Sequence, residues 1–328
     1  MPSHEGKSNQ PFVISREELA KFTILTAEET AKIRASEQEA KKPKDSGRGD
    51  YLTLDQAETI MGKENFFGTN EVEKAFGIKI DTKNTPEIPF TEADLERARE
   101  LGQFLVLRAD TAEDGQPLTM VKMNELLQNQ FVQGGIGKVL FNTTDAWKLN
   151  SEFFTTETPR VGWALVNKDS IPNSTSKNYL QQTQELAKYV TDEVFRDADS
   201  VPVEYQEAVD EFESYFANNF QGKTDAEIST LLGGGVWQKY AQELGDLKIN
   251  QLTRQTPSEV LYDLLMYFNV NGRLLENKYT WTNRRASDGD LVSVGGFVAD
   301  GAGARLRLGA WPLGFWSRRF FLPQSLIL

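Results

Sequence analysis

The stretch Thr256-Pro-Ser-Glu-Val-Leu-Tyr-Asp-Leu-Leu-Met-Tyr-Phe-Asn-Val-Asn-Gly272 carries the clearest structural signal in the chain. Thr256 suits the cap of a helix that begins at Pro257, and Glu259 at the third helical position completes a capping box. Asn271-Gly272 is a typical helix end. Behind the cap, one face of the helix is apolar: Val260, Leu261, Leu264, Leu265 and Phe268. The stretch therefore predicts an amphipathic helix that packs against the segment that follows it.

Strand patterns follow this helix. Residues 279–282 alternate aromatic residues with threonine, residues 287–290 have the composition of a turn, and residues 291–298 have that of a strand. Because successive strand residues point to opposite faces, Ser293 is expected on the face opposite its two valine neighbours. Residues 305–308 again alternate, here between arginine and leucine. The end of the chain is therefore predicted to be rich in β-structure.

Three regions differ in composition: a leader and linker at 1–50, an acidic, mainly helical α+β region at 51–250, and a β-rich module at 251–328. Seven Lys/Arg against three Asp give residues 277–328 a charge of +4, which leaves −16 on residues 1–276 of a chain with net charge −12. In the middle region the patterns predict strands at 103–108, 138–141, 147–149 and 162–166, and helices at 53–62, 91–102 and 204–216.

The composition excludes several classes of chemistry. The chain has 328 residues, no cysteine and one histidine, His4, so disulfides, thiolate metal sites, cysteine nucleophiles and imidazole-dependent triads are not expected. The negative net charge disfavours broad nucleic-acid binding, because phosphate contacts need a basic face. The run 134–138 resembles the end of a phosphate loop, but Val132 and Val139 stand where that motif needs Gly and Ser or Thr. A glycine-rich turn is the better interpretation.

The sequence has no evident export or membrane signal. Its first ten residues are polar, and the apolar stretch 311–328 contains Arg318 and Arg319 near its centre. We therefore expect neither a signal peptide nor stable membrane insertion. The expected location is the cytoplasm by default, with export by a leaderless route left open.

An aromatic side chain, two guanidinium groups and several short polar side chains fall within 13 residues of the C-terminal region. They are Trp281, Arg284, Arg285, Asp288, Asp290 and Ser293. Trp and Arg are frequent in binding hot spots, and short polar side chains provide adaptable hydrogen bonds. Composition alone favours a plainer interpretation, in which a β-hairpin has a core tryptophan and surface charges.

The stretch 273–301, Arg-Leu-Leu-Glu-Asn-Lys-Tyr-Thr-Trp-Thr-Asn-Arg-Arg-Ala-Ser-Asp-Gly-Asp-Leu-Val-Ser-Val-Gly-Gly-Phe-Val-Ala-Asp-Gly, resembles the C-terminal module of hypothetical proteins from uncultured bacterial lineages. That module is similar to the C-type-lectin-fold variable proteins of diversity-generating retroelements. The resemblance implies a rigid lectin-like scaffold whose ligand-binding face is rewritten by a reverse transcriptase. It ends at Gly301, after which only Leu313-Gly-Phe315 and Ser317-Arg318 echo the family's ending, at shorter spacing. The last part of the module is therefore expected to be incomplete.

Carried over position by position, the resemblance separates scaffold from display positions. The scaffold positions are Tyr279, Trp281, Val292, Val294 and Phe297. The display positions are Asn283, Arg284, Arg285, Asp290 and Ser293. Together with the hot-spot pattern, this gives a predicted ligand-binding set of Trp281, Asn283, Arg284, Arg285, Asp288, Asp290 and Ser293. Arginine side chains at 284 and 285 suit carboxylate or phosphate groups.

We therefore expect an α+β protein in which a mostly helical N-terminal region precedes a C-type-lectin-like module at 251–328. Its expected function is non-enzymatic binding of a protein or surface ligand, without cofactor or metal. Two alternatives stay open: an assembly protein that buries the apolar stretch from Trp311 in a partner, and a hydrolase that uses acidic pairs such as Asp192/Glu193 or Glu211/Glu213. The sequence does not specify the ligand or the oligomeric state.

Overall fold

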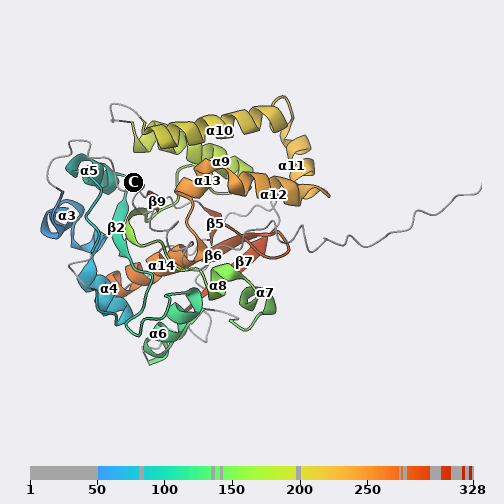
Figure 1. The fold of residues 1–328 in the computed structure, drawn as a ribbon. Coiled ribbons are helices and arrows are strands. Elements are labelled where there is room, and N and C mark those ends of the chain that lie inside the picture. The colour runs from blue at the N-terminus through green and yellow to red at the C-terminus, as the bar shows by residue number, and fades with distance from the viewer. Residues whose placement is uncertain are drawn as a thin grey trace, which may run out of the picture. The chain divides into compact units, whose positions relative to one another are not determined.

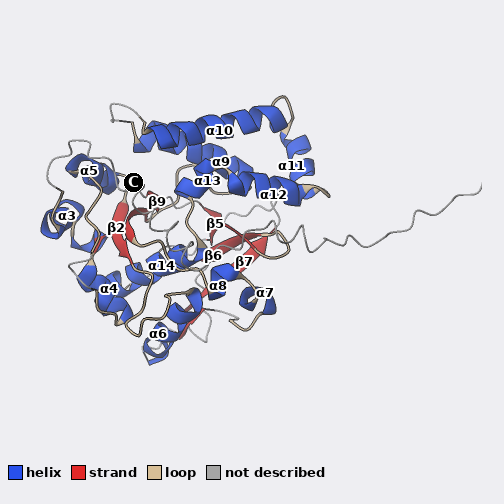
Figure 2. Ribbon diagram, viewed as in Figure 1, coloured by secondary structure: helices blue, strands red, loops and turns tan. Residues whose placement is uncertain are grey.

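Helix α14 (Pro257–Asn271) joins the parts of the fold, because it contacts strands of both β-sheets. The computed structural model describes residues 51–80, 85–133, 137–140, 143–196, 201–272, 275, 279–295, 304–311, 320–321 and 325–326, and residues 51–328 form one compact unit (Figure 1). The leader predicted at 1–50 lies outside the described residues. Helix makes up 54% and strand 15% of the structure, which confirms its mixed α and β composition (Figure 2).

All the other described helices precede α14 in the chain. They are α3 (Leu54–Met61), α4 (Thr69–Phe76), α5 (Glu92–Glu100), α6 (Met120–Gln133), α7 (Ala146–Leu149), α8 (Glu152–Thr155), α9 (Tyr179–Tyr189), α10 (Val203–Phe220), α11 (Asp225–Gly233), α12 (Trp237–Asp246) and α13 (Lys248–Thr253). A 3-10 turn (Lys63–Asn65) follows α3, and a π-helical turn (Val190–Val194) continues α9. The threonine cap predicted at Thr256 is confirmed, and the helices predicted from Thr53 and Thr91 likewise begin with those threonines as caps.

The strands form two small sheets. The first has four strands in the order β1 (Phe66–Phe67), β2 (Gln103–Arg108), β4 (Gly162–Asn167) and β9 (Ser325–Leu326). The second has five in the order β3 (Gly137–Leu140), β7 (Ala304–Trp311), β6 (Leu291–Gly295), β5 (Tyr279–Arg285) and β8 (Phe320–Phe321). The pairs β1–β2, β3–β7 and β5–β8 are parallel, and the other pairs are antiparallel.

One predicted strand is wrong. Residues 147–149 belong to α7, a single helical turn that begins after Asp145, instead of a strand. Three residues are too few to distinguish a period of two from one of 3.6, so the apolar Trp147 and Leu149 were compatible with either structure. The strands predicted at 103–108 and 162–166 are confirmed as β2 and β4, which pair with each other.

The alternation along β6 separates Ser293 from Val292 and Val294, yet all three residues are buried. Both faces of the strand are covered, and helices contribute to this cover. Helix α14 contacts both strands. The Tyr179 ring of α9 meets Trp281 of β5 edge-on, with 6.1 Å between ring centroids, and Trp281 lies opposite Ser293 in the sheet.

A single large apolar cluster extends from Ala57 to Leu308 and includes buried residues of both sheets and of α14. Helices α9 to α13 form a group of their own, in which α13 contacts α9, α10 and α12 (Figure 1). Strand β3 pairs with β7 and β4 pairs with β9, so each sheet combines strands from before and after residue 251. The domain boundary predicted at that residue is not marked by a gap in the core and stays a prediction.

Candidate ligand-binding site

The predicted site residues lie on the β5–β6 hairpin, at two different depths. Trp281 and Ser293 are fully buried opposite each other, and Asn283 is only 8% exposed. Arg284 and Arg285 keep 39% and 30% of their side chains exposed at the end of β5. Asp288 is exposed and Asp290 half-buried in the turn that follows. The structure therefore brings four charged members of the set to one accessible end of the hairpin and places the other three below it.

The turn between the two strands is closed by its own hydrogen bonds. The Ala286 amide donates to the Asp290 carbonyl over 2.8 Å, and the Gly289 amide donates to the Ala286 carbonyl over 2.9 Å. Gly289 has a φ of +92°, and a Cβ added there would lie 3.2 Å from Cγ of Gln238 on α12. Both the backbone angle and the neighbouring helix therefore favour glycine at this position. Burial, together with the nearby charge of Asp288, raises the pKa of Asp290.

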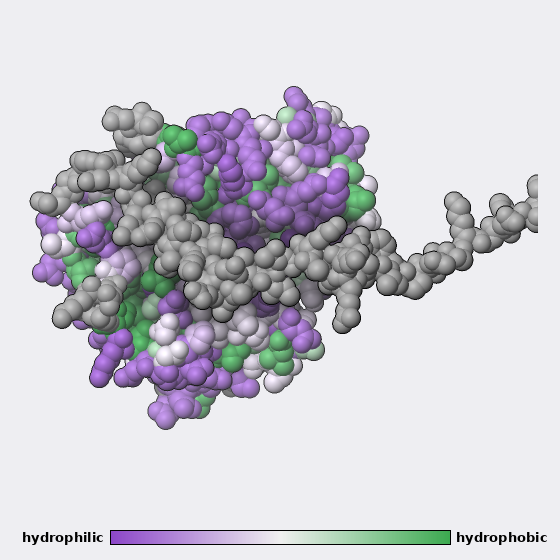
Figure 3. All heavy atoms as spheres, viewed as in Figure 1, coloured by the Kyte–Doolittle hydropathy of each residue, from purple (hydrophilic) through white to green (hydrophobic). Residues whose placement is uncertain are grey.

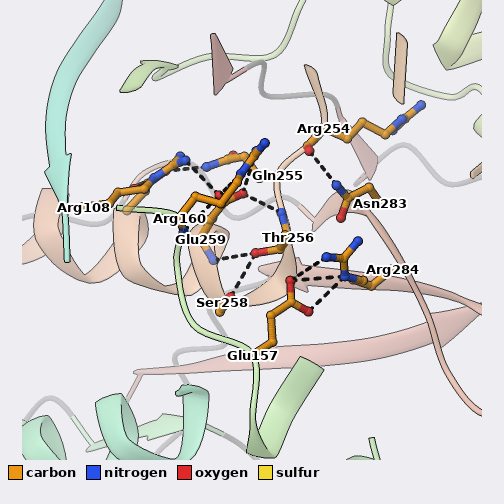
Figure 4. Close-up of polar contacts among 11 residues, drawn as sticks. Arg108, Glu157, Arg160, Arg254, Gln255, Thr256, Ser258, Glu259, Asn283 and Arg284 are labelled. Atoms are coloured by element: carbon orange, nitrogen blue, oxygen red, sulfur yellow. Dashed lines mark hydrogen bonds and ion pairs between the residues drawn. The ribbon is translucent and has the colours of Figure 1, made fainter. Parts of the chain in front are cut away.

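Asn283 anchors β5 to the segment that leads into α14. Its backbone amide donates to the Gln255 carbonyl over 3.1 Å, and its Nδ2 donates to the Arg254 carbonyl over 3.1 Å (Figure 4). The Oδ1 atom of Asn283 is buried without a hydrogen-bond partner among the described residues. These contacts make Asn283 a positioning residue that fixes where the neighbouring Arg284 leaves the sheet.

Arg254 supports the other side of this anchor. Its guanidinium stacks on the Tyr179 ring at 3.9 Å from the centroid, and its Nε donates to Oδ1 of Asn250 over 2.6 Å. The side chain is fully buried, and this burial lowers its pKa to about 10. Arg254, Tyr179 and Trp281 thus form a chain of contacts from α13 through α9 to β5.

The two accessible arginines already contact carboxylates. Arg284 donates from Nε to Oε1 and Oε2 of Glu157 over 3.2 and 3.0 Å, and its Nη2 lies 2.9 Å from Oε1 (Figure 4). Arg285 lies further from its partner, with 3.8 Å between its Nη2 and Oδ1 of Asp246 at the end of α12. No sequence signal pointed to Glu157 or Asp246, because each is far from the hairpin along the chain.

A buried ionic cluster underlies the site at the first turns of α14. Arg108 of β2 donates from Nε and Nη2 to the two oxygens of Asp263 over 3.1 and 2.6 Å, and its Nη1 lies 3.3 Å from Oε1 of Glu259. Arg160 donates from Nε to the same Oε1 over 2.6 Å (Figure 4). Gln255 donates to Asp263 as well. The sequence correctly placed Glu259 in the capping box, where its Oε2 accepts from the Thr256 amide over 2.8 Å, but missed this second role.

The pKa values of the two carboxylates in the cluster are shifted in opposite directions. Burial alone would raise the pKa of Glu259, but the charges of Arg108 and Arg160 and the hydrogen bonds to the carboxylate lower it from 4.5 to about 2. Burial dominates at Asp263 and raises its pKa. The cluster therefore holds Glu259 as an anion between two guanidinium groups at neutral pH.

Acid should destabilise the protein through Glu259. A carboxyl whose pKa is lower in the folded than in the unfolded chain stabilises the fold above its unfolded pKa, and this contribution is lost as the pH falls toward the folded value. The shift from 4.5 to about 2 corresponds to roughly 3 kcal/mol, lost between those two pH values. Denaturant unfolding from pH 6 to pH 2 should show a steeper acid loss for the wild type than for Glu259→Gln.

The comparison with Glu259→Gln isolates this contribution, because Asp263 and the exposed carboxylates titrate in both proteins. Asp263, whose pKa is raised, acts in the opposite sense: its protonation should increase the free energy of unfolding as the pH falls. Parallel pH profiles for the two proteins would show that Glu259 is not held by the arginines.

Hydrophilic residues dominate the outward face of α10 and the helices beside it (Figure 3). Within the part of the chain that the structure describes, no group of three or more His, Cys, Asp or Glu side chains is arranged to hold a metal ion. Among the same residues, no helix combines the length and the apolar character needed to cross a membrane.

Comparisons with known proteins give no assignment. No protein-family model matches the chain, and no curated protein and no solved structure matches it either. The candidate site therefore depends on its geometry and on the resemblance described above.

Proposed function

We propose that this protein is a non-enzymatic ligand-binding protein whose recognition face is the accessible end of the β5–β6 hairpin. In this proposal the C-terminal strands are a C-type-lectin-like module, and the face is diversified by a retroelement. The observation that carries the proposal is the position of Arg284 and Arg285: two half-exposed guanidinium groups at the end of a strand whose preceding four residues, 280–283, are buried. Arginines held in this way suit recognition of anionic groups on a protein or surface ligand.

The proposed face is smaller than the set chosen from sequence. Arg284, Arg285, Asp288 and Asp290 form the contact surface. Trp281, Asn283 and Ser293 lie beneath it and support it, since their side chains have little or no exposed area. This arrangement follows the general design of binding sites in which a rigid, packed layer holds a few exposed polar side chains in place.

The DNA at the 3′ end of the gene tests the proposed diversification directly. We expect a near-duplicate of the codons from Trp281 onward within the downstream kilobases, close to a reverse-transcriptase gene and differing mainly at template adenines. The exposed positions should vary between related strains, and the buried Trp281 should not. A genome with neither repeat nor reverse transcriptase would rule out retroelement diversification for this gene.

The double substitution Arg284→Ala/Arg285→Ala should separate binding from folding. Each arginine pairs with a carboxylate in a partly exposed position, and such pairs contribute no more than about 1 kcal/mol each. The melting temperature should therefore change little, while binding to an array of acidic peptides should be lost. A large fall in melting temperature would show that the arginines are structural and would contradict the proposed face.

A further inference from the structure

The anion-binding atoms of Arg284 are occupied by a residue of the same chain. Both Glu157 oxygens lie against one edge of the guanidinium, within 2.9 to 3.2 Å of Nε and Nη2. Figure 4 shows the two side chains meeting beside the first turn of α14. Only 18% of the Glu157 side chain is exposed, against 39% of that of Arg284. A planar carboxylate is thus already bound at the centre of the proposed recognition face.

Glu157 belongs to a loop that is attached to the site by two ion pairs of opposite polarity. The loop runs from α8 to β4, and it starts with the Glu157 amide donating to the Glu152 carbonyl over 2.9 Å. Glu157 reaches Arg284 on β5, and Arg160, three residues later, reaches Glu259 on α14. Because Arg160 remains bound to the buried Glu259, the Glu157 side chain can leave Arg284 without release of the whole loop.

The environment of Glu157 disfavours its charged form. Burial raises the pKa of its carboxyl above 4.5, and the nearby charge of Glu259 adds to this rise, although Arg284 opposes it. When the Glu157 carboxylate leaves Arg284, it escapes its burial and its repulsion from Glu259, which offsets part of the ion pair that it gives up. The internal pair is therefore open to exchange with an external carboxylate.

We propose that Glu157 is an internal stand-in for the ligand, and that the ligand is an acidic peptide segment whose Asp or Glu carboxylate displaces Glu157 from Arg284. This proposal rests on the proposed binding function and names its ligand chemistry. A carboxylate is favoured over other anions because the resident group is one, bound edge-on to the fork of Arg284. While Glu157 occupies Arg284, it lowers the apparent affinity by the fraction of molecules in which the site is blocked.

The substitution Glu157→Gln tests the proposal, because it removes the competing charge and keeps the size of the side chain. The probe is hexaglutamate, titrated at constant ionic strength and followed through the ¹⁵N–¹H signal of Arg284 Nε. We expect Glu157→Gln to bind the probe about tenfold more tightly than the wild type. Glu157→Ala should bind at least as tightly and serves as the second variant if the first is poorly folded. Adding Arg284→Ala to either variant should abolish the gain.

The matched control is Glu207→Gln, which removes one negative charge from an exposed ion pair with Lys248 elsewhere on the surface. It should bind hexaglutamate as the wild type does. Equal gains in Glu157→Gln and Glu207→Gln would show a net-charge effect, and no gain in either would show a purely structural ion pair; both results overturn the proposal. These outcomes are independent of the DNA test, which decides whether the face is diversified.

Discussion

Replacing Arg108 with methionine should lower the free energy of unfolding by about 3 to 5 kcal/mol. Arg108 is completely buried and bridges Asp263 and Glu259, whose side chains are 3% and 0% exposed. Without the guanidinium, the hydrogen bond from Gln255 is the contact of this cluster that Asp263 retains. The carboxylate charge then lies in the core without its counter-charge. Removing one partner of a buried pair is costly because the other partner can recover neither water nor a counter-charge. Denaturant unfolding at neutral pH measures the loss.

A double-mutant cycle with Asp263→Leu distinguishes this explanation from a simple loss of packing. If the unpaired carboxylate is the cause, Arg108→Met/Asp263→Leu should be markedly more stable than Arg108→Met alone. Lys248→Met, which breaks an exposed pair with Glu207, should leave the unfolding midpoint almost unchanged. A loss in Arg108→Met that is no larger than that in Lys248→Met would contradict the assignment of Arg108 as the centre of the buried cluster.

Replacing Trp281 with alanine should cost a similar amount, about 3 to 5 kcal/mol. The indole is fully buried between the Tyr179 ring and the sheet, and truncating it leaves a cavity that the β5–β6 pair cannot close. If Trp281 were mainly a ligand contact, the same substitution would reduce binding and leave stability intact. Unfolding measured without ligand therefore decides between the scaffold and the contact role.

Trp237→Ala provides the control for Trp281→Ala. Trp237 lies at the start of α12 beside the hairpin turn, and its side chain is only partly buried. The variant Trp237→Ala should lose clearly less free energy of unfolding than Trp281→Ala, because removing a partly exposed side chain leaves no closed cavity. Equal losses in the two variants would mean that Trp281 is not packed more tightly than a partly buried tryptophan.

Local signals in the sequence predicted local structure well. The cap at Thr256, the proline after it and the glycine after Asn271 fixed the limits of α14, because each acts through bonds within a few residues. The β5–turn–β6 hairpin followed from alternation and turn composition for the same reason. The strand predicted at 147–149 was wrong because three residues are too few to show a period.

The candidate site was only partly predictable. Residues on one hairpin share a short stretch of sequence, so Arg284 and Arg285 were found together. Both arginines are accessible, as expected of display positions, but the burial of Asn283 and Ser293 was not predictable. Alternation along a strand assumes one solvent-facing side, whereas residues on both faces of β6 are buried. Glu157 and Arg108 come to the site from other strands and loops, and no local pattern marks such long-range partners.

The pairing of early with late strands has a consequence for biosynthesis. Strand β4 pairs with β9, where Leu165 lies opposite Leu326, and β3 pairs with β7, where Gly137 lies opposite Ala304. A ribosome adds about 5 to 20 residues per second, so the partners of these two strands are made roughly 8 to 30 seconds later. During that interval β3 and β4 present unpaired backbone to other nascent chains on the same polysome. We therefore expect the newly made chain to need a chaperone until β7 and β9 emerge, although the finished protein pairs those edges.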